Sequence, residues 1–320
     1  MLSDRSCARG VGGAFAALGS IPMFRGASRR DVRIEALSNS FTNSSFRVDF
    51  GGDSFLLRLS GMGTSGYIDR AAEEHNARIA ARSGVNAEIL FSDAKSGTMV
   101  CRFIEGVGMD VEGFASDPTS PARAAAALRR VHRCGEGFAS RFDPFARIEA
   151  YARTLRRSRV PLPGDLDRTL EAARLMRRRL PPPPLAPCHN DPWPGNFVDG
   201  GLRMYLVDWE YSGMNDPMWD LADLSVEADF DVSKDRTFLE AYFGGPIPHD
   251  ARRRFEMQKP VCDLFWSLWG FLQTVNGNAR PGEDFLAYAN DRHERCKARL
   301  SAPEFSALFA GSENSKITVG

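Results

Sequence analysis

The fold is decided by residues 187–197, whose sequence is Pro-Cys-His-Asn-Asp-Pro-Trp-Pro-Gly-Asn-Phe, and by the segment Val-Asp-Trp-Glu-Tyr at residues 207–211. The first stretch carries a carboxylate at Asp191 and an amide at Asn196. The second stretch adds another carboxylate, Asp208, after a segment in which apolar and polar residues alternate as in a strand. Neighbouring strands would bring these three oxygen-bearing side chains to one place.

This set of oxygen groups is typical of phosphoryl transfer, and we interpret it as a kinase site. Asp191 would orient the acceptor hydroxyl, a role that depends on geometry as much as on pKa. Asn196 and Asp208 would hold Mg²⁺, which takes oxygen ligands and shares its coordination with the phosphates of ATP. Glu210 is predicted to be a further metal ligand or to support one. Singly, His189 could be a packing histidine and Asp191 a turn residue, but their joint spacing favours a catalytic loop that His189 braces.

Length and composition limit the class of protein. The chain has 320 residues, 43% of them hydrophobic, which suits one large domain or two lobes. A formal net charge of zero does not favour a nucleic-acid partner, and no apolar run reaches the roughly 18 to 20 residues of a membrane span. Nothing in the sequence indicates an oligomeric state.

The cysteines bear on the compartment. All six stand singly, which is typical of thiols in a reducing compartment, so we predict a cytoplasmic protein. Residues 11–24 are apolar, but their glycines and the preceding Asp4 do not favour an export signal.

The first third of the chain is predicted to be a sheet with one helix. Phe46, Val48 and Phe50 alternate with polar residues, and Gly-Gly-Asp at residues 51–53 turns the chain into a second alternating segment, which predicts a hairpin. Two further elements are expected: a helix over residues 68–83 that ends at Gly84, and a second hairpin over residues 89–91 and 98–104.

The rest of the chain is predicted to be mainly helical, with one further hairpin over residues 196–208. Its second strand would place Leu202, Met204 and Leu206 on one apolar face, after a turn at residues 199–201. Strand-rich structure is expected to end near residue 105, so the pattern predicts an α+β fold.

A kinase site also needs a cation on the nucleotide phosphates. The chain has 36 arginines but only five lysines, and no lysine precedes Lys95, which lies in a Ser/Gly turn. Arg58, on the second hairpin strand, is therefore the candidate, because a guanidinium can bind phosphate in a bidentate manner. The alternative is a solvated strand arginine.

A carboxylate from the following helix should hold this cation. Glu74 has Arg70 and Arg78 four residues away on either side, which is the usual surface pairing. We therefore predict that Glu73 holds Arg58, although Arg70 could also reach Glu73.

A loop that covers phosphate is expected at residues 38–43, Ser-Asn-Ser-Phe-Thr-Asn, between two strands. It contains no glycine, but its small polar side chains would let backbone N–H groups approach a phosphate. Ser40, Thr42 and Asn43 are the predicted nucleotide contacts.

Two tryptophans, Trp266 and Trp269, stand three residues apart and so share one helical face. Such a stripe is more often core. Together with a small-molecule kinase site, however, the two rings could wall a quaternary ammonium group through cation–π attraction.

These residues together resemble the choline/ethanolamine kinase family, within the wider group of aminoglycoside-phosphotransferase-like small-molecule kinases. The resemblance covers about residues 30 to 305. It is carried by His189-Asn190-Asp191 with Asn196, Asp208-Trp209-Glu210-Tyr211, residues 216–220, and the pair Trp266 and Trp269. Antibiotic kinases of the wider group typically have glycine where this chain has Asn190.

The resemblance implies a protein-kinase-like, two-lobed fold. A sheet-rich N-lobe would span residues 1–105 and a mainly helical C-lobe residues 106–320. The ATP base would lie at the hinge, near Phe103 and Ile104. The chain departs from the family in its nucleotide loop, where Asn39 and Ser40 replace a pair of glycines.

The implied activity is the transfer of the ATP γ-phosphate to choline, a small cationic alcohol. By resemblance, the choline pocket would use Tyr211, Glu227, Trp266, Trp269 and Tyr288, with Glu227 supplying negative charge. The alternatives are the same chemistry on ethanolamine, another amino alcohol or an aminoglycoside, and a non-catalytic protein that binds a nucleotide or a cationic metabolite.

Overall fold

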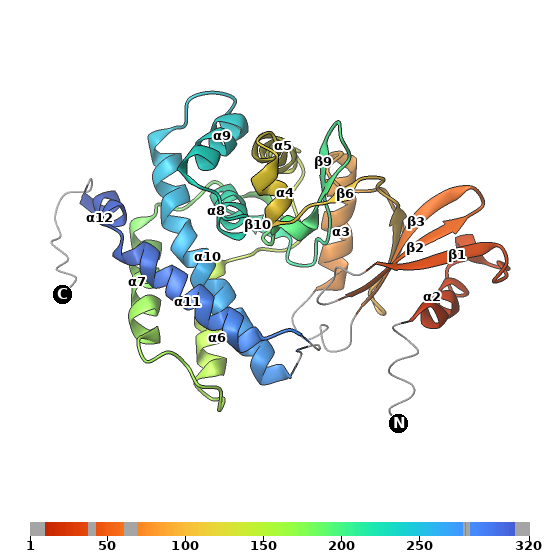
Figure 1. Ribbon diagram of the computed structural model, residues 1–320, viewed down its shortest axis with the longest axis horizontal. Helices are drawn as coiled ribbons and strands as arrows, with labels where there is room; N and C mark the ends of the chain where they lie inside the picture. The colour runs from red at the N-terminus through yellow and green to blue at the C-terminus, as the bar shows by residue number, and fades with distance from the viewer. Residues whose placement is uncertain (1–9, 38–42, 61–68, 278, 280–281, 311–320) are drawn as a thin grey trace. The chain divides into compact units, whose positions relative to one another are not determined.

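The computed structural model describes residues 10–37, 43–60, 69–277, 279 and 282–310. Two compact units make up the chain, and each is described by itself. The first comprises Met1–Arg141 and Pro187–Met214, and the second Phe142–Ala186 and Asn215–Gly320. Figure 1 gives the order and labels of the elements. The lobes predicted at residues 1–105 and 106–320 stay a prediction.

A five-stranded antiparallel sheet forms the N-terminal part of the first unit, in the order β1-β2-β3-β5-β4. The strands are β1 (Val32–Leu37), β2 (Asn43–Phe50), β3 (Asp53–Ser60), β4 (Ile89–Asp93) and β5 (Thr98–Arg102). Both predicted hairpins are present. The β2–β3 turn works because Gly51 and Gly52 have φ values of +63° and +90°, which glycine adopts at no steric cost.

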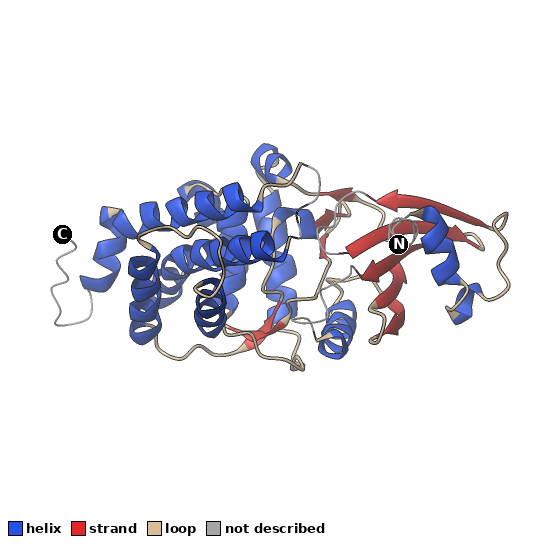
Figure 2. Ribbon diagram, turned by 90° about the horizontal axis from the view of Figure 1, so that it is seen from below, coloured by secondary structure: helices blue, strands red, loops and turns tan. Residues whose placement is uncertain are grey.

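The apolar stretch at residues 11–24 packs on this sheet. It forms α2 (Val11–Leu18) and the short 3₁₀ helix η1 (Pro22–Phe24). Leu18 and Phe24 are buried in one core with Phe46 and Leu57 of the sheet. Figures 1 and 2 show α2 beside β1. This segment is thus part of the core of the first unit.

Helix α3 (Arg70–Arg82) carries the carboxylate expected to hold Arg58. Asp69 caps its N-terminus by accepting hydrogen bonds from the N–H groups of Ala71 and Ala72. The helix ends before Gly84, which has a φ of +77°, so the predicted stop is confirmed. Its packed face includes Ile79 and also Glu73, whose side chain is only 2% exposed.

The rest of the first unit holds short strands and two helices around residues 187–214. These are β6 (Val107–Gly108), α4 (Val111–Ser116), α5 (Ser120–His132), β7 (Ala186–Cys188), η3 (Pro194–Asn196), β8 (Phe197–Asp199), β9 (Met204–Leu206) and β10 (Gly213–Asn215). The strands make a β6-β8-β9 sheet and a β10-β7 pair.

Two expectations about this region were wrong in detail. Strand structure does not end near residue 105, because β6 pairs with β8. The hairpin at residues 196–208 is present, with Asp199 opposite Met204, but Leu202 lies in its turn and is fully exposed. Leu202 therefore does not share the buried face of Met204 and Leu206, because the turn, and not the strand, decides its direction.

The second unit is helical, as Figure 2 shows. Its helices are α6 (Pro144–Leu155), α7 (Leu166–Arg179), α8 (Pro217–Glu227), α9 (Val232–Phe243), α10 (His249–Asn276), α11 (Phe285–Ser301) and α12 (Pro303–Ala310). Helix α10 packs against α6, α8 and α11, and it buries most of its residues. Phe265 of α10 lies edge to face with Trp219 of α8, with ring centroids 5.5 Å apart. An antiparallel sheet followed by a helical unit confirms the predicted α+β class.

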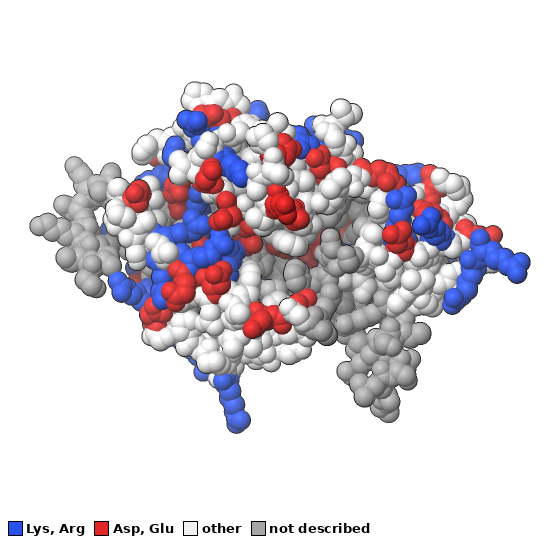
Figure 3. Space-filling model, in the orientation of Figure 1, with Lys and Arg blue, Asp and Glu red and all other residues white. Residues whose placement is uncertain are grey.

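Charged side chains on the surface are mixed in sign. In the face drawn in Figure 3, acidic and basic groups lie interspersed over the helices. In the second unit, for example, Arg174 of α7 pairs with Glu149 of α6, and Arg177 pairs with Asp143. Among the described residues, no helix combines the length and the apolar composition that crossing a membrane requires.

Candidate active site

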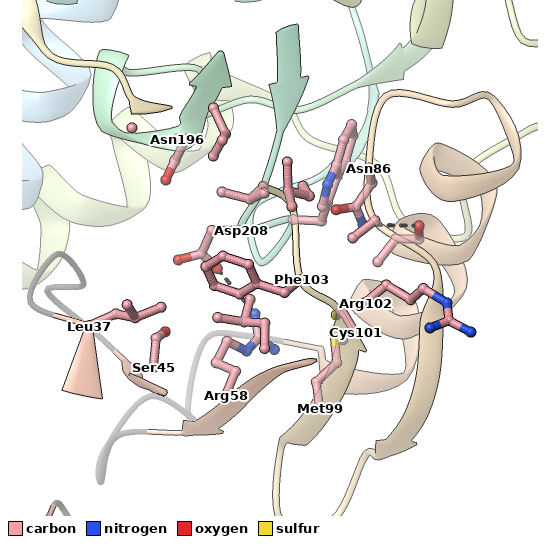
Figure 4. A pocket seen from close by; sticks show the side chains of 18 of the residues that line it. Leu37, Ser45, Arg58, Asn86, Met99, Cys101, Arg102, Phe103, Asn196 and Asp208 are labelled. Atoms are coloured by element: carbon pink, nitrogen blue, oxygen red, sulfur yellow. Dashed lines mark hydrogen bonds and ion pairs between the residues drawn. The ribbon is translucent and has the colours of Figure 1, made fainter. Parts of the chain in front are cut away.

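A cavity of about 350 Å³ lies in the first unit. Its lining includes five residues predicted from the sequence to contact nucleotide or metal, Arg58, Phe103, Ile104, Asn196 and Asp208, and also Glu73, which was predicted to hold Arg58. Figure 4 shows Arg58, Asn196 and Asp208 among the side chains around it, with Leu37 and Met99 adding apolar surface. An apolar cavity with a few convergent charged groups is the usual form of a small-molecule site.

Arg58 is the central charge of this cavity. Its Nη1 makes an ion pair with Glu73 and lies 3.1 Å from Oδ1 of Asp208, the contact drawn as a dashed line in Figure 4. Glu74 instead pairs with Arg78, at 2.9 Å. The side chain of Arg58 is only 9% exposed, so it is not a solvated strand arginine. Burial alone would lower its pKa, but the carboxylates of Glu73 and Asp208 raise it, so Arg58 stays charged.

A second arginine extends this network to Glu210. Nη1 of Arg70 lies 2.7 Å from Oε2 of Glu73 and 3.5 Å from Oε2 of Glu210. Nδ2 of Asn43 donates a hydrogen bond to the same Glu210 oxygen at 3.3 Å. Asn43, predicted to contact nucleotide, thus contacts Glu210, while Ser40 and Thr42 lie outside the described residues. The sequence pattern paired Arg70 with Glu74 or Glu73 on its own helix, so its contact with the distant Glu210 was missed.

The catalytic loop is braced by its polar side chains. Nε2 of His189 lies 2.9 Å from the carbonyl oxygen of Val207, and its buried ring stands edge to face with Trp209. Asn190 has a φ of +69°, a left-handed conformation that asparagine tolerates better than most residues, and its side chain donates to the carbonyl of Tyr211 at 3.0 Å.

Asp191 is joined to Asn196 through the backbone. Nδ2 of Asn196 donates to the carbonyl oxygen of Asp191 at 2.9 Å, and the N–H of Val207 donates to the carbonyl of Asn196 at 2.9 Å. These bonds tie the loop to the residue that precedes Asp208. Asp208 itself has a φ of +64°, a left-handed backbone conformation that is uncommon for residues other than glycine. The loop and the second carboxylate are therefore held in one fixed arrangement.

The charges of the cavity fit a bound cation. Three carboxyl groups, Glu73 and Asp208 in the lining and Glu210 beside it, contact the guanidinium groups of Arg58 and Arg70, and a bound cation would relieve the repulsion between Asp208 and Glu210. Burial raises the pKa of Asp208, and burial together with the charge of Asp208 raises the pKa of Glu210 to about 8. Asp208 and Asn196 both line the cavity and offer oxygen atoms, which are the donors that Mg²⁺ prefers.

A separate group of predicted residues meets in the second unit. The rings of Trp266 and Trp269 are 5.7 Å apart at 80°, and those of Trp269 and Tyr288 are 6.3 Å apart at 82°. We call these three residues the aromatic cluster. Glu227 makes an ion pair with Arg292, whose guanidinium lies 5.7 Å from the centre of the Tyr288 ring. Tyr211, the fifth residue predicted for this pocket, belongs to the first unit and is buried there.

Two residues around the aromatic cluster were missed from the sequence. Asp223 of α8 accepts a hydrogen bond from Nε1 of Trp266 at 2.7 Å, and Arg292 of α11 holds Glu227. A signal was present, because Asp223 lies four residues before Glu227, and Arg292 four residues after Tyr288. Each pair therefore shares one helical face.

The close approach of α10 and α11 depends on Gly270. A Cβ at this position would lie 2.9 Å from Cδ1 of Tyr288 and 3.0 Å from Cβ of Ala289. A glycine directly after Trp269 thus allows Tyr288 to reach the tryptophan.

Comparisons with known proteins agree with this architecture. Residues 33–256 match the model of the phosphotransferase enzyme family. The structure of a choline/ethanolamine kinase family protein from Mesorhizobium loti is 43% identical, with a TM-score of 0.83, and the match covers 97% of this chain and 98% of that one. Protein LicA of Haemophilus influenzae is 26% identical over 259 residues, covering 78% of this chain and 95% of LicA.

Two solved structures of LicA are also similar. The choline kinase LicA of Streptococcus pneumoniae is 27% identical, with a TM-score of 0.74 and coverage of 90% of this chain and 97% of that chain. A structure of LicA in complex with AMP is 26% identical, with a TM-score of 0.70 and coverage of 87% and 95%.

The cavity, the loop and the fold thus define a phosphotransferase. The chain belongs to the phosphotransferase enzyme family and, within it, to the choline/ethanolamine kinase family. The predicted family, the protein-kinase-like fold and the class of enzyme, an ATP-dependent phosphotransferase with an alcohol as acceptor, are confirmed.

Proposed function

We propose that this protein transfers the γ-phosphate of ATP to the hydroxyl group of choline, giving phosphocholine and ADP. The observation that carries the choice of acceptor is the aromatic cluster, in which Trp269 contacts both Trp266 and Tyr288. Aromatic faces attract a quaternary ammonium through cation–π interaction, and this attraction needs no hydrogen bond. The name of the similar LicA structure, choline kinase, supports the same acceptor.

The nucleotide would occupy the cavity of the first unit. Its base would lie near Phe103 and Ile104, and its phosphates near Arg58, which Glu73 holds in place. A guanidinium whose orientation is fixed by a carboxylate can bind phosphate oxygens without first losing conformational freedom. A similar LicA structure was solved in complex with AMP, which supports the binding of a nucleotide.

Asn196 and Asp208 would hold Mg²⁺, and Glu210 would support Asp208 as a neighbouring carboxylate. The ion held by these residues would supply charge neutralisation at the phosphates of ATP. Arg58 contacts Asp208, so the phosphate cation and the metal carboxylate lie side by side. Arg70 and Asn43 fix the carboxylate of Glu210 and limit how far it can turn.

Asp191 would align the choline hydroxyl for in-line attack and accept its proton. The loop that carries it is fixed by His189, Asn190 and Asn196, each of which hydrogen-bonds a backbone carbonyl. Most of the rate enhancement would come from this positioning and from charge neutralisation, since the protein has little covalent chemistry to do.

An assay of ADP release tests this proposal. Choline, ethanolamine, other amino alcohols and aminoglycosides should be compared with magnesium and ATP, using the wild type and Asp191→Ala. Choline should be the best acceptor, and Asp191→Ala should lower its turnover at least about a hundredfold. Asp93→Ala, at the last residue of β4, is the control. No turnover of any alcohol, or equal turnover by wild type and Asp191→Ala, would refute the mechanism.

We also infer that the protein works in a reducing compartment such as the cytoplasm. The described cysteines form no disulfide bond with one another, and four of them, Cys101, Cys188, Cys262 and Cys296, are buried. Cysteines without disulfides are typical of reducing compartments.

A further inference from the structure

We propose that Arg292 makes the aromatic cluster selective for a quaternary over a primary ammonium group, because Arg292 occupies the carboxylates that a primary ammonium would need. Arg292 would be a specificity-determining residue that does not touch the substrate. This inference rests on the proposed function, since it concerns how choline is preferred to ethanolamine.

Arg292 contacts two carboxylates and one aromatic ring of the second unit. It lies on α11 with a side chain that is 3% exposed. It makes an ion pair with Glu227 of α8, and its Nη1 lies 3.1 Å from Oδ1 of Asp263 on α10. Its guanidinium is also 5.7 Å from the centre of the Tyr288 ring. One buried cation thus joins two carboxylates at the edge of the aromatic cluster.

The carboxylates around the aromatic cluster also contact other groups of the protein. Asp263 is fully buried and also lies 2.8 Å from Nε of Arg299 and 3.7 Å from Nε of Arg295. Asp223 uses one oxygen for the indole of Trp266, and its other oxygen is buried without a hydrogen-bond partner among the described residues. The charges of Glu227 and Asp263 are therefore directed toward the protein's own cations, whereas one oxygen of Asp223 is not.

Choline and ethanolamine differ in the hydrogen bonds that their cationic groups require. A primary ammonium has three N–H donors, and burying them without acceptors is costly. A trimethylammonium group has no N–H, and its charge can be met by the faces of Trp and Tyr rings. A site with aromatic faces, in which Arg292 occupies Glu227 and Asp263, therefore favours choline over ethanolamine.

Glu227 acquires a different role from the one that the family resemblance implies. It was expected to supply negative charge to the substrate directly. Its side chain is 15% exposed but is engaged by Arg292, which in turn lies beside Tyr288. Glu227 would thus act as a positioning residue, by fixing Arg292 and through it the ring of Tyr288.

The test compares kcat/KM for choline and for ethanolamine in the wild type and in Arg292→Met. The substitution replaces the aliphatic stem of the arginine with an apolar side chain, removes the guanidinium and so frees Glu227. The choline-to-ethanolamine ratio should exceed one in the wild type and should fall at least about tenfold in Arg292→Met, mainly through a lower KM for ethanolamine. The KM for ATP should not change, whereas a general structural defect would alter it as well.

Arg299→Met is the matched control. It also removes a guanidinium from Asp263, but Arg299 has no described contact with Glu227 or Tyr288. Its choline-to-ethanolamine ratio should stay that of the wild type. If Arg299→Met lowers the ratio as much as Arg292→Met, the selectivity comes from the charge of Asp263 in general, and the proposal is overturned.

A double variant keeps the proposal testable if Arg292→Met does not fold, since that variant leaves buried carboxylates short of a partner. Glu227→Gln with Arg292→Met removes both charges of the pair and should return the ratio to the wild-type value. If the double variant instead loses kcat/KM for choline about a hundredfold with its ATP binding intact, Glu227 binds the substrate cation directly and the proposal is wrong.

The outcomes separate this inference from the proposed function. A wild-type protein that phosphorylates no amino alcohol refutes the proposed function. A wild type that phosphorylates choline but prefers ethanolamine, or an unchanged ratio in a folded Arg292→Met, refutes only the role of Arg292.

Discussion

Arg58 in the first unit and Arg292 in the second are both buried arginines that bridge two carboxylates, but they sit in different surroundings. Arg58 lies between Glu73 and Asp208 in the lining of a cavity, and Asp208 is still 22% exposed. Arg292 of α11 pairs with Asp263 of α10, which is fully buried, and with Glu227 of α8, which is 15% exposed. One arginine lines a cavity, whereas the other joins three helices of the second unit.

The electrostatic environment differs in the same sense. The carboxylates around Arg58 raise its pKa despite burial, whereas burial and the neighbouring Arg295 lower the pKa of Arg292 to about 9. The same kind of ion pair can therefore prepare a site for an anion or remove charge from a site for a cation. We infer that which of the two it does depends on whether the pair faces the cavity.

The largest effect is expected where the cavity arginine is removed. Arg58→Met would lose the phosphate cation, so kcat/KM for ATP should fall about a thousandfold. It would also leave the buried Glu73 short of a partner, so the free energy of unfolding should fall by about 3–5 kcal/mol. ADP release and thermal unfolding measure the two effects. Arg33→Met, on the exposed side of β1, should change neither. Full activity of Arg58→Met would show that the cavity does not bind ATP phosphates.

A matched pair of neighbours on α3 sharpens the same point. Glu73→Gln keeps the shape of the side chain but removes the charge that fixes Arg58 and Arg70, so kcat/KM for ATP should fall about a hundredfold. Burial alone would raise the pKa of Glu73, but Arg58 and Arg70 lower it, so Glu73 is charged in the wild type and Glu73→Gln removes that charge. Glu74→Gln breaks only a surface pair with Arg78 and should change activity by less than about twofold. Equal effects of the two substitutions would contradict the assignment.

In the second unit the expected effect is smaller and specific to the acceptor. Trp266→Ala removes one aromatic face, so the KM for choline should rise about tenfold while the KM for ATP stays the same. Phe265→Leu, next to it on α10, changes the core instead, because Phe265 is fully buried against Trp219 and Phe142. It should lower the melting temperature and leave both KM values unchanged. A parallel loss of choline and ATP binding in Trp266→Ala would indicate that this tryptophan only packs the core.

The features that the sequence predicted are those that nearby residues determine. The β2–β3 hairpin follows from alternation over consecutive residues and from two glycines in its turn. Glu73 could be preferred to Glu74 because the competing arginines of Glu74 stand one helical turn away. Both arguments use contacts within one or two elements.

The features that were missed depend on how distant elements pack. Arg70 reaches Glu210 across 140 positions of the chain, and Arg292 reaches Glu227 because α11 and α8 both pack on α10. No periodicity indicates such a contact. Strand β6, with two residues, is too short to alternate, and Leu202 followed the strand pattern but lies in the turn.

The smallest effect is expected at Gly270, where the aromatic cluster depends on backbone spacing. Gly270→Ala would place a methyl group 2.9 Å from the Tyr288 ring, so α11 or the tyrosine must move by a few tenths of an ångström. Trp269 and Tyr288 would then separate slightly, which should raise the KM for choline about threefold and leave the KM for ATP unchanged. Gly277→Ala, after the end of α10, strains a residue with a φ of +65° but meets no side chain, so it should lower stability without changing the choline KM. If both glycine variants raise the choline KM equally, the effect comes from a less stable α10, and the spacing of the aromatic cluster is not what determines choline affinity.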